Sequence, residues 1–215
     1  MRLIRSAGLF LAADVFLIAV HVWLYFAAIG LPLFDIALDR SYPEFYQYLK
    51  WYWLVCLSLY LGIRLRKITF PLLAPAFALL LIDDAFTLHE ALGGEIASRL
   101  GLQASFNIRT QDMGELAFLG FSAIAIFMFW AMAYHFASTS ARKHLKLIGA
   151  FLLLLGFFGG AMDAVHEAAS RFGLTAYFLA GTLEDGGEMI VLSLLTGLLL
   201  RLANDTRSAE GIAVR

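Results

Sequence analysis

A His-Glu pair occurs twice in this chain, each time inside an apolar stretch that carries further acidic residues. Residues 79–90 read LLLIDDAFTLHE and residues 157–167 read FFGGAMDAVHE. Side chains three and four positions apart share one face of a helix, so Asp163, His166 and Glu167 should point the same way. Imidazole and carboxylate groups gathered on one face can bind a divalent metal ion or carry protons through a membrane.

The acidic residues of the second half of the chain are strongly clustered. Ten of the seventeen acidic residues fall in four short patches near predicted helix ends. The patches are Asp83, Asp84 and Glu90; Asp112 and Glu115; Asp163 and Glu167; and Glu184, Asp185 and Glu188. The membrane topology that the Lys and Arg positions predict, described below, places all four patches at the same depth in the membrane, together with His89 and His166.

These acids lack an obvious compensating cation. An unpaired acid near the centre of a bilayer costs about 2.5–3.5 kcal/mol, and the nearest candidates are Arg99, Arg109 and Arg171. The stretches 68–98, 110–141, 147–170 and 172–200 contain no Lys or Arg. Protonation or bound metal cations are the remaining ways to neutralise the acids.

The two His-Glu pairs belong to an internal repeat. The first copy reads HEA at 89–91, ASRLGL at 97–102 and QDMGEL at 111–116. The second copy reads HEA at 166–168, ASRFGL at 169–174 and EDGGEM at 184–189. Phe106 with Phe178 and Thr110 with Thr182 extend the match, and LGGEI at 92–96 is an insertion. The pattern predicts a duplicated helix pair.

Carboxylates and histidines from both halves, on facing helices, resemble the ligand set of carboxylate-bridged di-metal bundles in type and symmetry. The order departs from the Glu-x-x-His pattern of that class, and Phe86 stands where Asp163 would align. The resemblance implies two divalent metal ions, with iron favoured over manganese or zinc. The predicted ligands are Glu90, Glu115, Glu167, Glu188, His89, His166 and Asp163; Asp83, Asp84, Asp112, Glu184 and Asp185 are assigned to the surrounding shell or to alternative ligation.

Simpler interpretations stand beside this one. Asp112 with Glu115, and Asp185 with Glu188, fit the spacing of an N-terminal helix cap. A His-Glu step at a helix end can also be a hydrated interfacial pair. Gly156, Gly159 and Gly160 are typical of close helix packing. Asp14 and His21 are expected to form helix contacts, His135 and His144 to lie at an interface, and Cys56 to fill the core.

The composition predicts a membrane protein. Hydrophobic residues make up 61% of the chain, and the mean hydropathy is +0.77, whereas soluble domains are about 45–50% apolar. No basic run indicates nucleic acid as a partner, so the expected partners are the lipid bilayer and a lipid-like substrate. The stretches that match the roughly 20 residues of a spanning helix are 7–30, 47–66, 68–92, 112–136, 145–170 and 182–203.

The predicted fold is all-α, with about six transmembrane helices and a pseudo-twofold four-helix inner bundle. Residues 1–67 form two N-terminal helices outside this bundle, 68–136 the first repeat, 145–203 the second and 204–215 a tail. Lys and Arg lie at alternate helix ends, which by the positive-inside rule puts both termini in the cytoplasm of an inner-membrane protein. The interfacial segment 31–50 is either a connection or a cover over a site.

Three functions remain open at this point. The first is a membrane di-metal enzyme, an oxidoreductase or metal-assisted hydrolase that acts on an apolar or lipid-like substrate. The second is an ion, metal or proton transporter or channel that uses the intramembrane acids. The third is a haem protein with His89 and His166 as axial ligands.

Overall fold

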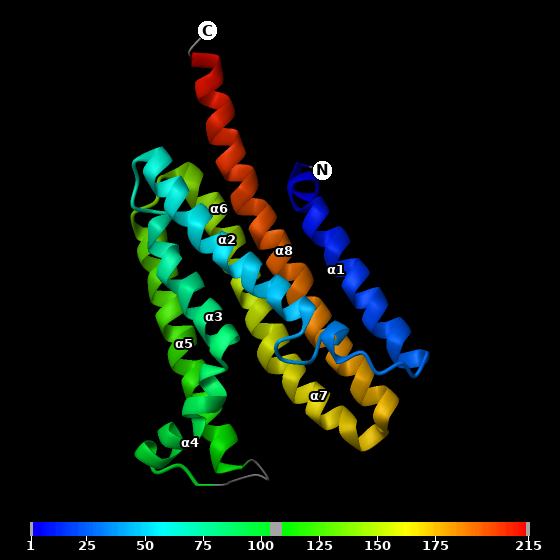
Figure 1. Cartoon of the computed structure of the whole chain (residues 1–215). Coiled ribbons are helices and arrows are strands. Elements are labelled where there is room, and N and C mark those ends of the chain that lie inside the picture. The colour runs from blue at the N-terminus through cyan, green and yellow to red at the C-terminus, as the bar shows by residue number, and fades with distance from the viewer. Residues whose placement is uncertain (1, 104–108, 214–215) are drawn as a thin grey trace.

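The computed structural model describes residues 2–103 and 109–213, and every regular element in them is a helix (Figure 1). Phe106, paired with Phe178 in the repeat, lies outside these residues. The α-helices are α1 (Arg2–Phe26), α2 (Tyr42–Leu65), α3 (Ala74–Phe86), α4 (Leu88–Leu100), α5 (Thr110–His135), α6 (Thr139–Gly156), α7 (Asp163–Ala169) and α8 (Leu174–Ala213). The short elements are the 3-10 helices η1 (Pro32–Phe34), η2 (Pro71–Leu73) and η4 (Ser170–Phe172), and the π-helix η3 (Phe157–Met162).

The prolines help to define where helical elements begin. Each of the four lies at the first or second position of a helical element. The missing N–H costs no hydrogen bond there, because the first backbone N–H groups of a helix have no intrahelical partner. These positions are Pro32, Pro43, Pro71 and Pro75.

Within the residues that the structure describes, four helical segments are long and apolar enough to cross a membrane. They are Leu3–Phe26, Thr110–His135, Thr139–Phe172 and Leu174–Thr206. The bent pair Pro71–Phe86 and Leu88–Leu100 makes a fifth if it counts as one span. α2, which was predicted to span, falls outside this group, because its first half carries polar side chains such as Gln47 and Lys50.

The predicted helix over 68–92 is broken at Thr87. Thr87 has a φ of 45°, and the helix axis turns by 91° between α3 and α4. The Thr87 N–H donates to the Asp83 carbonyl, which ends α3. The Asp83 carboxylate then accepts a hydrogen bond from the His89 N–H at 3.0 Å. One acidic residue therefore closes the first helix and supports the start of the next.

α8 lies at the centre of the packing. It contacts α1, α2, α6 and α7, and in Figure 1 it lies between α1 and the other helices. The expected inner bundle of the last four spans, with the first two helices outside it, is therefore not the observed packing. The side chains that α8 buries completely or nearly so include Met189, Leu192, Leu195, Leu198 and Leu199.

Close helix contacts depend on glycine at two crossings. A Cβ on Gly114 of α5 would overlap the carbonyl of Gly93 on α4. A Cβ on Gly197 of α8 would overlap Ala7 of α1, which is itself fully buried. Small residues thus allow the backbones to approach, as they commonly do between membrane helices.

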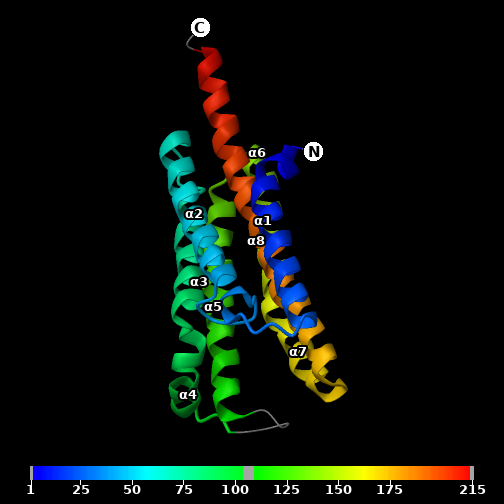
Figure 2. The same ribbon diagram turned by 45° about the vertical axis from the view of Figure 1, so that its right-hand side comes forward.

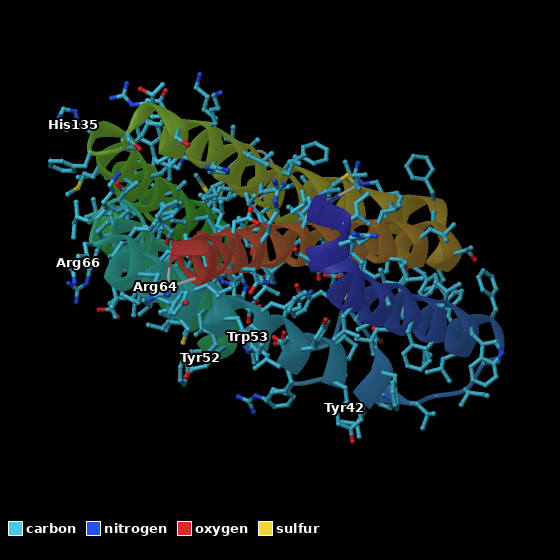
Figure 3. All side chains as sticks on the ribbon, turned by 90° about the horizontal axis from the view of Figure 1, so that it is seen from above. Tyr42, Tyr52, Trp53, Arg64, Arg66 and His135 are labelled. Atoms are coloured by element: carbon cyan, nitrogen blue, oxygen red, sulfur yellow. The ribbon has the colours of Figure 1, made fainter. Side chains whose placement is uncertain are left out.

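The two chain termini lie at the same end of the molecule, and α4, α7 and the connection 27–41 lie toward the opposite end (Figures 1 and 2). Seen from above, Tyr42, Tyr52 and Trp53 point outward from α2 (Figure 3). Large apolar side chains also face outward elsewhere: Leu9 is 83% exposed and Leu153 is 78% exposed. Such a surface fits lipid better than water.

Candidate functional site

Seven of the twelve sequence-predicted acids and histidines line one cavity of about 300 Å³. Its wall is built from the connection before α2, the first turn of α2, both sides of the α3–α4 bend, α7 and α8. The lining residues are Ala37, Asp39, Glu44, Asp84, Thr87, His89, Glu90, Asp163, His166, Glu184 and Asp185. We call this space the acid cavity.

The acid cavity is strongly unbalanced in charge. Seven carboxylates and two histidines line it, and none of the described residues in its wall is Lys or Arg. Carboxylates placed together in a partly dry space repel one another unless protons or cations neutralise them. The cavity is therefore built to attract positive charge.

His89 is oriented by Asp83. The ring Nδ1 lies 3.0 Å from the Asp83 carboxylate, and the backbone N–H of His89 donates to the same oxygen. Because an ionised carboxylate only accepts hydrogen bonds, Nδ1 carries the proton. In the neutral form of the ring the lone pair is then on Nε2, which lies 4.0 Å from the Glu90 carboxylate.

His166 is held in the same manner from the other half of the chain. Its Nδ1 lies 2.8 Å from the Glu184 carboxylate of α8. The ring packs on Tyr177, with 4.1 Å between the ring centroids. It also lies over Gly181, where a Cβ would fall 2.7 Å from Cε1 of the ring. A histidine with Nδ1 bound to a carboxylate and Nε2 left as an acceptor has the arrangement of most metal-bound histidines.

A π-helix precedes the second histidine. The segment Phe157–Met162 leads directly into Asp163, and such segments are common at functional sites. A Cβ on Gly159 would overlap the Glu188 carboxylate, so this glycine makes room for an acid of α8. The packing prediction thus holds for Gly159. It is wrong for Gly156 and Gly160, where a Cβ would meet open space.

Four of the seven predicted metal ligands line the acid cavity: Glu90, His89, His166 and Asp163. Glu115, Glu167 and Glu188 are not among its lining residues. Glu115 accepts a hydrogen bond from Gln111 at 2.9 Å. Glu188 nonetheless lies near enough to Asp84, Asp163 and Asp185 to feel their charges.

The two aligned acid pairs have different surroundings. Asp112 forms a capping box with Arg109 at the start of α5, with an ion pair at 2.8 Å. Asp112 thus takes part in capping as the N3 residue opposite Arg109, and not as the N-cap paired with Glu115 that its spacing predicted. Asp185 and Glu188 lie well inside α8, which begins at Leu174, so the capping interpretation is wrong for them.

The acid cavity does not close on a single point. Among the residues that the structure describes, no group of three or more His, Cys, Asp or Glu side chains is placed to hold a metal ion. Carboxylates and histidines therefore surround a space that is wider than one ion. Bound cations would have to draw these side chains inward.

The segment 31–50 forms part of the site. Ala37, Asp39 and Glu44 line the acid cavity, so this segment is part of the cavity wall as well as a connection between two helices. His21 of α1 lies 3.2 Å from the Asp35 carboxylate and 3.4 Å from the Ile36 nitrogen. The hydrogen bond with His21 lowers the pKa of Asp35, although burial and the loss of hydration oppose this shift.

Sequence reasoning missed a buried cation. Lys50 of α2 donates to Asp14 of α1 at 3.0 Å, and both side chains are fully buried. The ammonium group also donates to the Met189 carbonyl at 3.0 Å and to the Ser193 hydroxyl at 3.3 Å. The expected helix contact of Asp14 is confirmed. The missed signal was one Lys and one Asp in the two apolar stretches that precede the repeats.

The structure thus defines an all-helical protein that has several helices of membrane-spanning length and a cavity rich in carboxylates and histidines. The chain belongs to the family described as a domain of unknown function, DUF8692, whose model matches residues 11–202. This match runs from α1 into α8 and includes every residue that lines the acid cavity. Neither a curated protein nor a solved structure matches the chain.

Proposed function

We propose that this protein is a membrane-embedded, metal-dependent enzyme that binds two divalent cations in the acid cavity and acts on a lipid-like substrate. The observation that supports this most strongly is the pair of histidines, one from each half of the chain. Each is held through Nδ1 by a carboxylate, with Nε2 left as an acceptor beside further acids. Metal-bound histidines are commonly oriented in this way, by a carboxylate that accepts a hydrogen bond from the other ring nitrogen.

The donor set narrows the choice of ion. Carboxylate oxygens and imidazole nitrogens suit iron, manganese and zinc, and no thiolate lines the cavity in the described part of the chain. We favour iron and an oxidation reaction, because carboxylate-rich helical bundles commonly hold a pair of these ions. Zinc or manganese would instead supply a metal-activated water for hydrolysis.

The proposal includes six membrane spans with both termini in the cytoplasm. With α2 and the bent α3–α4 pair each counted as one span, six spans follow, and an even number agrees with termini at one end (Figure 1). The C-terminal end of α2, with Arg64 in its last turn and Arg66 at its cap, lies toward that same end (Figure 1), which the positive-inside rule assigns to the cytoplasm of an inner-membrane protein.

Local geometry supports the proposed duplication. The α-helix is interrupted before each HEA segment, at Thr87 in one copy and at Phe157–Met162 in the other. The aligned glycines Gly101 and Gly173 both have positive φ, at 65° and 103°. The copies differ after this point, because α8 is continuous where α5 begins anew.

A second candidate function is cation or proton transport. The observation in its favour is a set of buried polar residues between α1, α2 and α8, beyond the acid cavity. Lys50 pairs with Asp14 there, and Ser58, Ser193 and Thr196 are fully buried. A transport pathway needs polar steps across the membrane thickness, and these side chains supply several.

The haem alternative is weaker. A haem needs a large apolar slot, whereas His89 and His166 face a cavity of about 300 Å³ walled mainly by carboxylates. That volume is at the lower limit for small-molecule sites. An intense Soret band in the absorbance spectrum of the purified protein would reverse this judgement.

Metal analysis of the detergent-purified protein by mass spectrometry tests the proposal. We expect about two equivalents of iron, manganese or zinc in the wild type and loss of metal in the double variant His89→Ala, His166→Ala. His135→Ala is the matched control, because His135 is exposed at the end of α5 and away from the cavity. A folded wild-type protein that takes up no metal, even when these ions are added, would overturn the enzyme proposal. Cation flux into vesicles that contain the wild-type protein would then support transport.

A further inference from the structure

A second cavity of about 310 Å³ lies next to the acid cavity. Asp39 and Thr87 line both spaces, so they form the partition between them. The remaining lining residues of the second space are Arg40, Tyr48, Ala85 and Phe86. We call it the Arg40 cavity, and its chemistry differs from that of its neighbour.

The backbone of Arg40 is fixed at the entrance to α2. Its φ is 60°, and its N–H donates to the Glu44 carboxylate. Ser41 caps α2, since its hydroxyl accepts a hydrogen bond from the Glu44 N–H at 3.3 Å. The Arg40 side chain therefore starts from a rigid position at the N-terminus of a 24-residue helix, where the helix dipole favours anions.

The guanidinium group of Arg40 forms no salt bridge with any residue in the described ranges. Two other arginines differ in this respect: Arg99 in the last turn of α4 pairs with Glu95, and Arg109 at the start of α5 pairs with Asp112. A fixed arginine that is exposed and not used in an internal pair can bind a phosphate or carboxylate through two hydrogen bonds.

The other side of the Arg40 cavity is apolar and open to the surroundings. Phe86 is 68% exposed, although it lies one residue before the α3–α4 bend, and Ile82 four residues earlier is 45% exposed. On the neighbouring helix α2, Phe45 and Leu49 are also exposed at a spacing of four. The Phe45 ring packs edge-on against the Tyr48 ring of the cavity wall, at 5.6 Å between centroids. Two apolar stripes thus lead away from the cavity.

The internal repeat is broken at this place. Phe86 aligns with Asp163, which lines the acid cavity from the other copy. Where one half supplies an acid, the other supplies an exposed aromatic ring beside an unpaired arginine. Because of this asymmetry, the Arg40 cavity has a charged side at Arg40 and an apolar side at Phe86.

We propose that the Arg40 cavity binds the anionic headgroup of a membrane lipid. The acyl chains would lie along the two apolar stripes, Phe45 with Leu49 and Ile82 with Phe86. The bond next to the headgroup would then face the partition of Asp39 and Thr87, beyond which the acid cavity lies. This inference names the substrate class of the proposed enzyme and rests on that function only for the reaction, since lipid binding is measured separately.

The test compares lipid binding by three proteins with native mass spectrometry and with fluorescent lipid titration in detergent. The wild type should prefer phosphatidylglycerol to phosphatidylcholine, and Arg40→Gln should bind phosphatidylglycerol about tenfold more weakly, because a charge-assisted bidentate contact is lost. Arg66→Gln is the matched control: Arg66 also has a positive φ, of 50°, but it lies at the opposite end of α2 from Arg40. Arg40→Lys should bind with intermediate strength.

Equal affinities in the wild type, Arg40→Gln and Arg66→Gln would overturn the proposal. So would equally tight binding of glycerol 3-phosphate, which would indicate an anion site without a lipid role. Metal content is measured on the same wild-type sample. Lipid selectivity in a metal-free protein would leave the lipid site standing and overturn the enzyme, whereas a metal-loaded protein without lipid selectivity would do the opposite.

Discussion

The Lys50 ammonium of α2 lies 3.0 Å from the Asp14 carboxylate of α1, and neither side chain is exposed. The pair is also tied to α8 through Ser193 and the Met189 carbonyl. One oxygen of Asp14 is buried without a hydrogen bond. This ion pair therefore joins the three helices at the centre of the packing, at a substantial desolvation cost.

Breaking this pair on one side should be more harmful than removing both charges. Lys50→Met should lower the free energy of unfolding by about 3–5 kcal/mol, because Asp14 is left as an uncompensated buried charge. The double variant Lys50→Met, Asp14→Leu should recover most of that loss. Thermal unfolding in detergent measures the effect, with Lys67→Met as an exposed control. A double variant as unstable as the sum of the single variants would show that the two charges do not interact.

The positions of the long helices were largely predictable from the apolar runs, and prolines mark the starts of α2 and α3. The break at Thr87 was not, since LLLIDDAF contains no glycine or proline. It depends on Asp83, which accepts hydrogen bonds through both its carbonyl and its carboxylate. Lys50 was missed for another reason: whether a lysine beside Trp51 faces solvent or a partner depends on how α1 and α8 pack against α2.

The site residues were predictable by type but not by pairing. The motifs at 111–116 and 184–189 are nearly alike, yet Asp112 is bound to Arg109 while Asp185 lines the acid cavity. The difference arises from the chain before each motif. Arg109, in an extended conformation just before α5, reaches Asp112, whereas the continuous helix α8 carries Asp185 into the interior.

These different surroundings predict different effects of the same substitution. Asp163→Asn should weaken cation binding about tenfold or more, because Asp163 lines the acid cavity beside His166. Asp112→Asn should leave cation binding unchanged and alter the free energy of unfolding by no more than about 1 kcal/mol, since the pair with Arg109 is exposed. Calorimetric titration with Mn²⁺ compares them. Equal weakening by both variants would contradict the distinction.

The contact between His21 and Asp35 predicts a dependence of stability on pH. The hydrogen bond to His21 lowers the pKa of Asp35 from its ordinary value of 3.8, so ionised Asp35 stabilises the folded state above that pH. The contribution is lost as the pH falls below 3.8 and through the lowered folded-state pKa.

Wild type and Asp35→Asn should therefore differ in unfolding temperature at neutral pH, and the difference should shrink below about pH 4. In a His21→Phe background, Asp35→Asn should have little further effect, because the partner is already absent. A difference that stays constant from pH 7 to pH 3 would show that the ionised carboxylate does not contribute.

Gly114 offers a test of the fold that is independent of the site. A methyl group at this position would overlap the backbone of Gly93, and a backbone cannot move aside as a side chain can. Gly114→Ala should therefore destabilise the packing of α4 on α5 by about 1–3 kcal/mol, as overpacking usually does. Gly120→Ala lies on the same helix in open space and should stabilise slightly, because alanine favours helix. Denaturation monitored by circular dichroism distinguishes the two variants.

Gly181 tests whether His166 acts through its fixed position. A Cβ at residue 181 would fall 2.7 Å from Cε1 and 2.8 Å from Nε2 of the His166 ring, so Gly181→Ala should push the ring away from Glu184. If Nε2 binds a cation, affinity for Mn²⁺ should fall about tenfold or more, because the hydrogen bond to Glu184 that orients the ring is lost. Gly120→Ala again serves as the control with the same change of residue type. Because the substitution leaves every carboxylate in place, a general loss of negative charge cannot explain weaker binding, and unchanged affinity would show that His166 is not a ligand.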